Sequence, residues 1–102
     1  MTEIRNRITE LWTLLFDNTQ NLILNGMFAT MFTGMNGEEE AVLTLLGWLR
    51  THRVVDYAAA GANNHTIAQE LRTALRNYGN AVADDNAKFH IAQATNLLNN
   101  VL

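Results

Sequence analysis

Residues 22–35 of the chain read LILNGMFATMFTGM, and they lie within a stretch, residues 18–37, that contains no charged side chain. Three of the four methionines and two of the four phenylalanines fall in this segment. Such an apolar run avoids water by packing in the protein's own interior or against another subunit. The segment therefore indicates a helical core or a subunit interface rather than a catalytic site.

A membrane span is not expected for this segment. As an α-helix, residues 22–35 would be about 21 Å long, whereas the hydrocarbon core of a bilayer is about 30 Å thick. Asn25 also interrupts the apolar run. Residues 1–5 enter an amphipathic pattern directly, with no positively charged region followed by an apolar one, so we expect no secretion signal and a cytoplasmic location.

Composition excludes several classes of function. The 102 residues predict one helical domain, residues 1–102. The chain contains no cysteine and no serine, which excludes disulfides, thiolate metal sites, nucleophiles of either type and a P-loop. Charged residues make up only 17%, and a weakly charged surface favours self-association. The net charge of −3 gives no electrostatic signature of nucleic-acid binding.

Before the apolar segment, Ile4, Ile8, Leu11 and Leu15 recur at helical spacing and predict an amphipathic helix, with Arg5 among the charged residues off this stripe. Residues 17–21 read DNTQN, which allows either a turn between two helices or a polar turn within one helix. A single helix over residues 3–33 would be about 46 Å long. We favour a break near residue 18, because the long helix would leave the apolar segment exposed unless a second subunit covered it.

After the apolar segment, Gly34 and Gly37 end one helix, and Asn36 is predicted to cap the next. Residues 38–40, three glutamates, then fill the first turn, where the helix dipole favours negative charge. Residues 41–49 are apolar on nearly every side, which predicts a central helix. We expect this helix to end in residues 58–61, which read AAAG.

Two further helices are predicted near the end of the chain. Asn63 and Asn64 indicate a loop and cap, and residues 78–80 a helix stop. Asp84 or Asp85 is predicted to cap the last helix. The inward positions are Ile67, Leu71, Leu75 and Tyr78 in one helix and Ala87, Ile91, Ala94, Leu98 and Val101 in the other. The sequence thus predicts an all-α fold, a compact bundle of four to five antiparallel helices with short turns.

No constellation of catalytic or metal-binding residues is apparent. His52 and Asp56 share a helix face, but two ligands do not complete a metal site. Asp84 and Asp85 are adjacent, so their side chains point apart on a helix. We therefore expect no enzyme activity, no metal and no cofactor.

The apolar segment is the strongest candidate for a functional surface. Met27, Met31 and Met35 recur every four residues, with Phe28 and Phe32 beside them. Flexible methionines suit adaptable protein contacts. We expect a non-enzymatic protein-interaction module, namely a small regulator, inhibitor or assembly component. Its expected partners are a second copy of itself, as a homodimer, and another protein.

Two other functions remain open from the sequence. One is a helical bundle that binds a small ligand or cofactor between its helices. The other is a nucleic-acid-associated regulator, although the net charge disfavours nucleic acid as a partner. Four arginines are candidate contacts for an anion or a partner: Arg50, Arg53, Arg72 and Arg76.

The predicted homodimer can be tested with the substitution Met31→Glu. Each large apolar side chain removed from water contributes roughly 1.5–3 kcal/mol, so a buried carboxylate in the interface should dissociate the dimer while helicity persists. Sedimentation analysis together with circular dichroism measures both properties. A wild-type monomer at micromolar concentration would instead assign the segment to the core.

Overall fold

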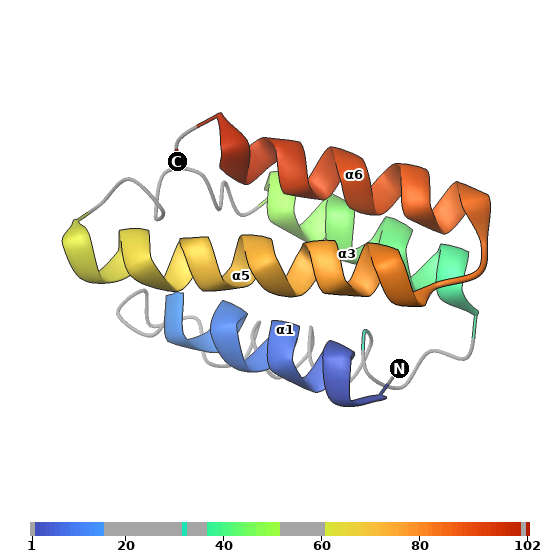
Figure 1. Ribbon diagram of the computed structural model, residues 1–102, viewed down its shortest axis with the longest axis horizontal. Coiled ribbons are helices and arrows are strands. Elements are labelled where there is room, and N and C mark those ends of the chain that lie inside the picture. Colours follow the sequence, from blue (N-terminus) through green and yellow to red (C-terminus); the bar gives the residue numbers. More distant parts are fainter. Residues whose placement is uncertain (1, 16–31, 33–36, 52–60, 101) are drawn as a thin grey trace.

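The computed structural model describes residues 2–15, 32, 37–51, 61–100 and 102 of the chain, and within these ranges the protein is all-α with no strand (Figure 1). The helices are α1 (Thr2–Leu15), α3 (Glu38–Thr51), α5 (Ala62–Ala81) and α6 (Asp85–Asn99). Helix α5 packs against α1 on one side and α6 on the other, and α3 packs against α6. The predicted all-α class is confirmed for the described part of the chain.

The helix directions agree only in part with the predicted antiparallel order. Helix α5 runs opposite to α1 and α6, whereas α1, α3 and α6 all run the same way (Figure 1). Two contacts between α1 and α3 show this parallel arrangement, because Arg5 pairs with Glu38 near the start of both helices and Trp12 meets Trp48 further along both. The ring centroids of the two tryptophans lie 6.5 Å apart in an edge-on arrangement.

The core contains the predicted inward stripes of α1, α5 and α6. The buried residues on these helices include Ile8, Leu11, Trp12, Leu15, Leu71, Leu75, Tyr78, Ala87, Ile91, Ala94 and Leu98. Ile4 and Ile67 are partly buried and pack against this core. The predicted inward faces are therefore confirmed at the described positions, while Val101 lies outside the described residues.

The central helix predicted for residues 41–49 buries one face of the segment and not its whole circumference. Ala41, Val42, Leu45, Leu46 and Leu49 are buried, but Leu43 is 45% exposed. The reason is that α3 turns one face to the bundle, and Leu43 lies off that face. Among the described helices, α5 packs between α1 and α6, and α6 packs between α5 and α3.

Helix α5 is longer at both ends than its sequence indicates. It begins directly after Gly61, whose φ of 149° is a backbone conformation that other residues rarely adopt, so Asn63 and Asn64 lie in the first turn and not in a loop. It also continues through Gly79 to Ala81. A Cβ atom at Gly79 would lie 3.3 Å from Cγ2 of Ile91, so this glycine permits close packing against α6 rather than ending the helix.

The cap predicted for the last helix is confirmed. The side chain of Asp84 accepts a hydrogen bond from the backbone N–H of Ala87 at 3.1 Å. This bond satisfies one of the N–H groups left unpaired at a helix start. With only residues 82–84 between them, α5 and α6 form an antiparallel hairpin.

The polar interior at one end of the bundle was not predicted. Arg5 is 4% exposed and forms an ion pair with Glu38 at 2.8 Å. Its Nε donates to the Tyr78 hydroxyl at 3.2 Å, and its Nη1 donates to the backbone carbonyl of Phe32 at 3.3 Å. The Tyr78 hydroxyl in turn donates to Glu38 at 2.8 Å. These bonds join α1, α3 and α5, so Glu38 does more than complement a helix dipole.

The charges of this network follow from its geometry. Burial lowers the pKa of Arg5, but the hydrogen bonds with Glu38 and Tyr78 raise it, and the net shift is upward. The guanidinium therefore stays charged. Burial, reinforced by the hydrogen bond that the hydroxyl donates to Glu38, raises the pKa of Tyr78 to about 12. Tyr78 is thus a neutral donor under ordinary conditions.

Arg5 and Arg7 provide a matched pair for measuring what the buried network contributes. Arg5→Ala removes the guanidinium from both Glu38 and Tyr78, which keep only the hydrogen bond to each other, and should lower the free energy of unfolding by about 2–4 kcal/mol. Arg7 forms exposed ion pairs with Glu10 and Glu70, so Arg7→Ala should cost less than about 1 kcal/mol. Urea denaturation measures both values, and equal losses would contradict a structural role for the buried guanidinium.

Tyr78 should make stability depend on alkaline pH. Its pKa is about 12 in the folded chain, against a reference value of 10.0. The folded state therefore retains a proton that the unfolded state releases, and stability falls as the pH rises from about 10 to about 12. Compared with Tyr78→Phe, the wild type should lose of the order of 2 kcal/mol more over this range. Parallel pH profiles would contradict the assignment.

Candidate functional site

A groove with a volume of about 420 Å³ lies between α5 and α6. Helix α5 contributes Arg76, Gly79 and Asn80, and α6 contributes Lys88, Ile91, Ala92, Thr95 and Asn96. We call this the α5–α6 groove. Its floor is apolar at Ile91 and Ala92, and cations and amides surround this floor.

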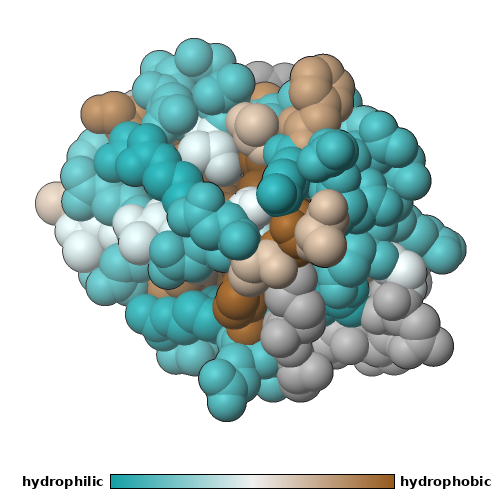
Figure 2. Space-filling view, turned by 45° about the vertical axis from the view of Figure 1, so that its right-hand side comes forward, coloured by the Kyte–Doolittle hydropathy of each residue, from teal (hydrophilic) through white to brown (hydrophobic). Residues whose placement is uncertain are grey.

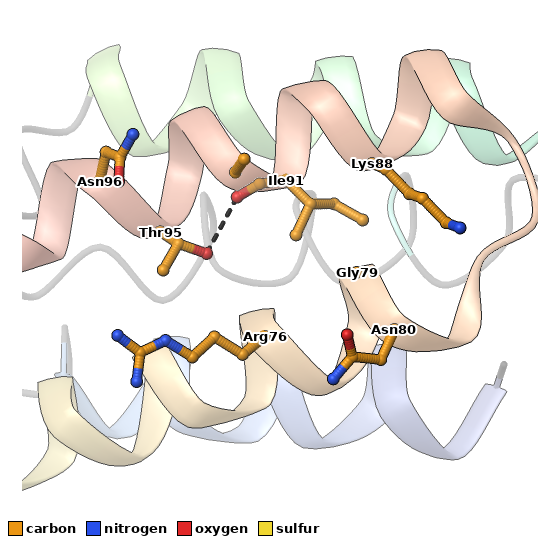
Figure 3. Close-up of a pocket in the computed structure, with 8 residues that line it drawn as sticks. Arg76, Gly79, Asn80, Lys88, Ile91, Thr95 and Asn96 are labelled. Atoms are coloured by element: carbon orange, nitrogen blue, oxygen red, sulfur yellow. Dashed lines mark hydrogen bonds between the residues drawn. The ribbon is translucent and has the colours of Figure 1, made fainter.

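The side chains of the groove have distinct orientations (Figure 3). Ile91 points toward Gly79 in the middle of the groove, whereas Arg76 and Lys88 extend away from each other toward its two ends. The hydroxyl of Thr95 donates to the backbone carbonyl of Ile91 at 3.0 Å, so it is engaged within its own helix. The groove therefore has two separate positive ends with an apolar centre.

A second arginine lies one turn before Arg76 on α5. Arg72 and Arg76 both donate to the side-chain oxygen of Asn99 on α6, at 3.2 Å and 3.5 Å. The amide of Asn99 is oriented by a further bond to Asn96 at 3.4 Å. Two guanidinium groups thus share one neutral acceptor. We call Arg72, Arg76 and Lys88 the cationic row.

The cationic row lacks a matching set of carboxylates. Within the described part of the chain, no carboxylate forms an ion pair with any of its three members, and Nε of Arg72 is buried without an acceptor. From Leu71 to the last residue the chain contains only two acidic residues, Asp84 and Asp85. Asp84 is engaged as the cap of α6. The row is therefore locally positive on a chain whose net charge is −3.

Two other clusters do not form binding sites. The smaller hollow lined by Arg7, Glu70, Thr73, Ala74 and Asn77 contains its own ion pair, since Arg7 bonds Glu70 at 3.4 Å. In the network around Arg5, Arg5 and Tyr78 are buried and Glu38 is partly exposed, and the bonds of the network are made internally. Both clusters serve the packing of α1 against its neighbours.

The apolar interaction surface predicted from the sequence is only partly described. Met27, Phe28, Met31 and Met35 lie outside the described residues, so their prediction stays untested. Phe32 is fully buried in the core of the chain. Its ring meets that of Tyr78 edge-on, with 6.0 Å between centroids. The side chain of Phe32 therefore packs within its own chain.

The four predicted arginines are divided by the structure. Arg72 and Arg76 come together at Asn99, as their shared helix face indicates. Arg50 is exposed on α3 and does not line the groove, and Arg53 lies outside the described residues. Sequence analysis missed Lys88, Asn96 and Asn99 as members of the site. The spacing of Lys88, Ala92 and Asn96 on one helix face was the available signal.

Hydrophilic residues cover most of the described surface on the face shown in Figure 2, and hydrophobic residues appear there in small separate areas. The large apolar side chains exposed in the described chain are Leu14, Leu43 and Phe89, each on a different helix. Phe89, 62% exposed, directly follows Lys88 on α6. None of these residues forms a broad apolar patch by itself.

Neither a metal centre nor a membrane segment is found in the part of the chain that the structure describes. No three His, Cys, Asp or Glu side chains gather there as a metal ion requires. No described helix is long and apolar enough to cross a membrane. Comparisons of the chain with protein-family models, with curated proteins and with solved structures gave no match.

Proposed function

We propose that this chain is a non-enzymatic protein-interaction module, a small regulator, inhibitor or assembly component, that binds its partner on the α5–α6 groove. The observation that carries the proposal is the cationic row, whose three members have no carboxylate partner among the described residues. A like-charged pair one turn apart, such as Arg72 and Arg76, destabilises a helix by roughly 0.2–0.5 kcal/mol. A partner that carries negative charge offsets this cost.

The lining of the groove supports binding rather than catalysis. Arginine and lysine are donors that stay charged, and the asparagines offer neutral hydrogen bonds. Neither a carboxylate nor an imidazole is among the lining residues that the structure describes, so no general acid–base pair faces the groove. The geometry favours recognition of a second molecule through charge and shape.

The apolar helical surface expected from the sequence remains a separate proposal. A homodimer through residues 27–35 would leave the α5–α6 groove free to bind a partner only if the dimer surface and the groove do not overlap. Sedimentation of the Met31→Glu variant, combined with the binding experiment below, measures the two contacts independently.

Partner binding should depend on the groove cations. Immobilised wild-type chain is compared with Arg76→Glu, Lys88→Glu and the control Arg50→Glu in a lysate of the source cells. Replacing an attraction by a repulsion at either end should weaken retention of a groove partner by about tenfold. Arg50→Glu changes the charge equally but lies outside the groove, so it should retain the partner.

Three outcomes would contradict the proposed function. A partner that is still retained by both groove variants binds elsewhere on the chain. A loss of retention that is equally large with Arg50→Glu indicates unspecific electrostatic binding. A small molecule that co-purifies in native mass spectrometry and is lost with Lys88→Glu would favour a ligand-binding bundle.

A further inference from the structure

We infer that the α5–α6 groove receives an acidic peptide segment of the partner, in which carboxylates flank an apolar side chain. The inference rests on the proposed function and specifies the chemistry of the ligand. It follows from three features of the groove, namely the shared acceptor at one end, the lysine at the other and the apolar floor between them.

The first feature is the arginine pair. One neutral oxygen, that of Asn99, serves both Arg72 and Arg76, and the longer of the two bonds is 3.5 Å. Arginine presents five donors in a planar fork, and a carboxylate accepts two of them at once. Arg76 is exposed, so a carboxylate from outside reaches its remaining donors. A ligand carboxylate at this end therefore supplies the acceptor that the described chain lacks.

The second feature is the separation of the cations. Arg76 and Lys88 point toward opposite ends of the groove, with Ile91 between them (Figure 3). A single phosphate placed at one end leaves the other cation without a partner. A ligand with two anionic groups spaced along its length satisfies both ends, and a peptide with acidic residues on either side of a spacer has this form.

The third feature is the floor. Ala92 is exposed and presents apolar surface between the two ends, whereas Ile91 lines the groove but is only 2% exposed. An aliphatic side chain of the ligand removes this surface from water and contributes about 25 cal/mol for each Å² covered. A sugar–phosphate chain offers no such group at the corresponding position. The floor therefore favours a peptide over a nucleic acid.

The overall charge points the same way. Duplex DNA carries a negative charge about every 1.7 Å along its axis, and a chain with net charge −3 repels such a polyanion outside the groove. An acidic peptide confines its charges to the few positions that meet the cationic row. Arg72, Arg76 and Lys88 are enough for that ligand and too few for a nucleic-acid footprint.

The probe for this inference is the peptide Glu-Glu-Leu-Glu-Glu with blocked ends, titrated into the isotopically labelled full-length chain and followed by NMR. The backbone amides of α5 and α6 around Arg76, Lys88 and Ala92 should shift. The matched peptide Gln-Gln-Leu-Gln-Gln should bind at least about tenfold more weakly. Added salt should weaken the binding of the acidic peptide, because salt screens the attraction between exposed charges.

A neighbouring pair of asparagines supplies matched variants of the protein. Asn99→Asp places a carboxylate between Arg72 and Arg76 and should lower the affinity for the acidic peptide about tenfold, because the site then contains its own anion. Asn100→Asp adds the same charge one residue later, beyond the bonds recorded for Asn99, and should change the affinity less than about threefold. Asn99→Asp should also unfold at a higher temperature than Asn100→Asp.

The alternatives give different results. Equal affinity for the Glu and Gln peptides, or shifts confined to α1 and α3, would overturn the inference, as would no binding at millimolar peptide. If inorganic phosphate at the same concentration as the peptide causes the same NMR shifts and saturates them, the groove is a simple anion site. Tighter binding of oligothymidylate than of the peptide would indicate a nucleic-acid site.

The failure of this inference differs from failure of the proposed function. If the peptide does not bind but a protein partner from the lysate still depends on Arg76 and Lys88, the interaction function stands and only the acidic-segment chemistry is wrong. If no protein partner depends on either residue, the proposed function itself is wrong.

Discussion

The arrangement of α1, α3 and α5 depends on the pairing of the buried Arg5 guanidinium with its acceptors. A charge in the interior requires oriented acceptors, and here Glu38, Tyr78 and the carbonyl of Phe32 supply them. These partners come from the start of α3, the last turns of α5 and a residue between α1 and α3. Satisfying one side chain therefore places three parts of the chain at the same end of the bundle.

Two groups of cations in the described chain have opposite surroundings. Arg5 is buried with three acceptors, and removing any one of them leaves a costly unpaired group. Arg72 and Arg76 instead share one neutral oxygen, and Lys88 has no ion pair within the described residues. The buried pairing of Arg5 contributes to the stability of the folded chain. The second group carries the proposal of a partner, because Arg76 and Lys88 are exposed where a second molecule can reach their charges.

The sequence predicted part of the candidate site. Arg72 and Arg76 were among the four arginines predicted as contacts, and the structure brings these two together at Asn99. Lys88 was missed, since the sequence does not say which side of α6 meets α5. That contact depends on Gly79, which resembles a helix stop in the sequence but permits the close approach of Ile91 in the structure.

The sequence by itself determined the helical class of the described chain, its inward stripes and a cap at Asp84 or Asp85, because periodicity and capping depend on residues a few positions apart. The tertiary structure alone decided the helix directions, the burial of Arg5 and the joining of Arg76 with Lys88 across a groove. These features depend on which faces of distant helices meet. Such pairing is set by the packing of the whole core, and a local pattern cannot contain it.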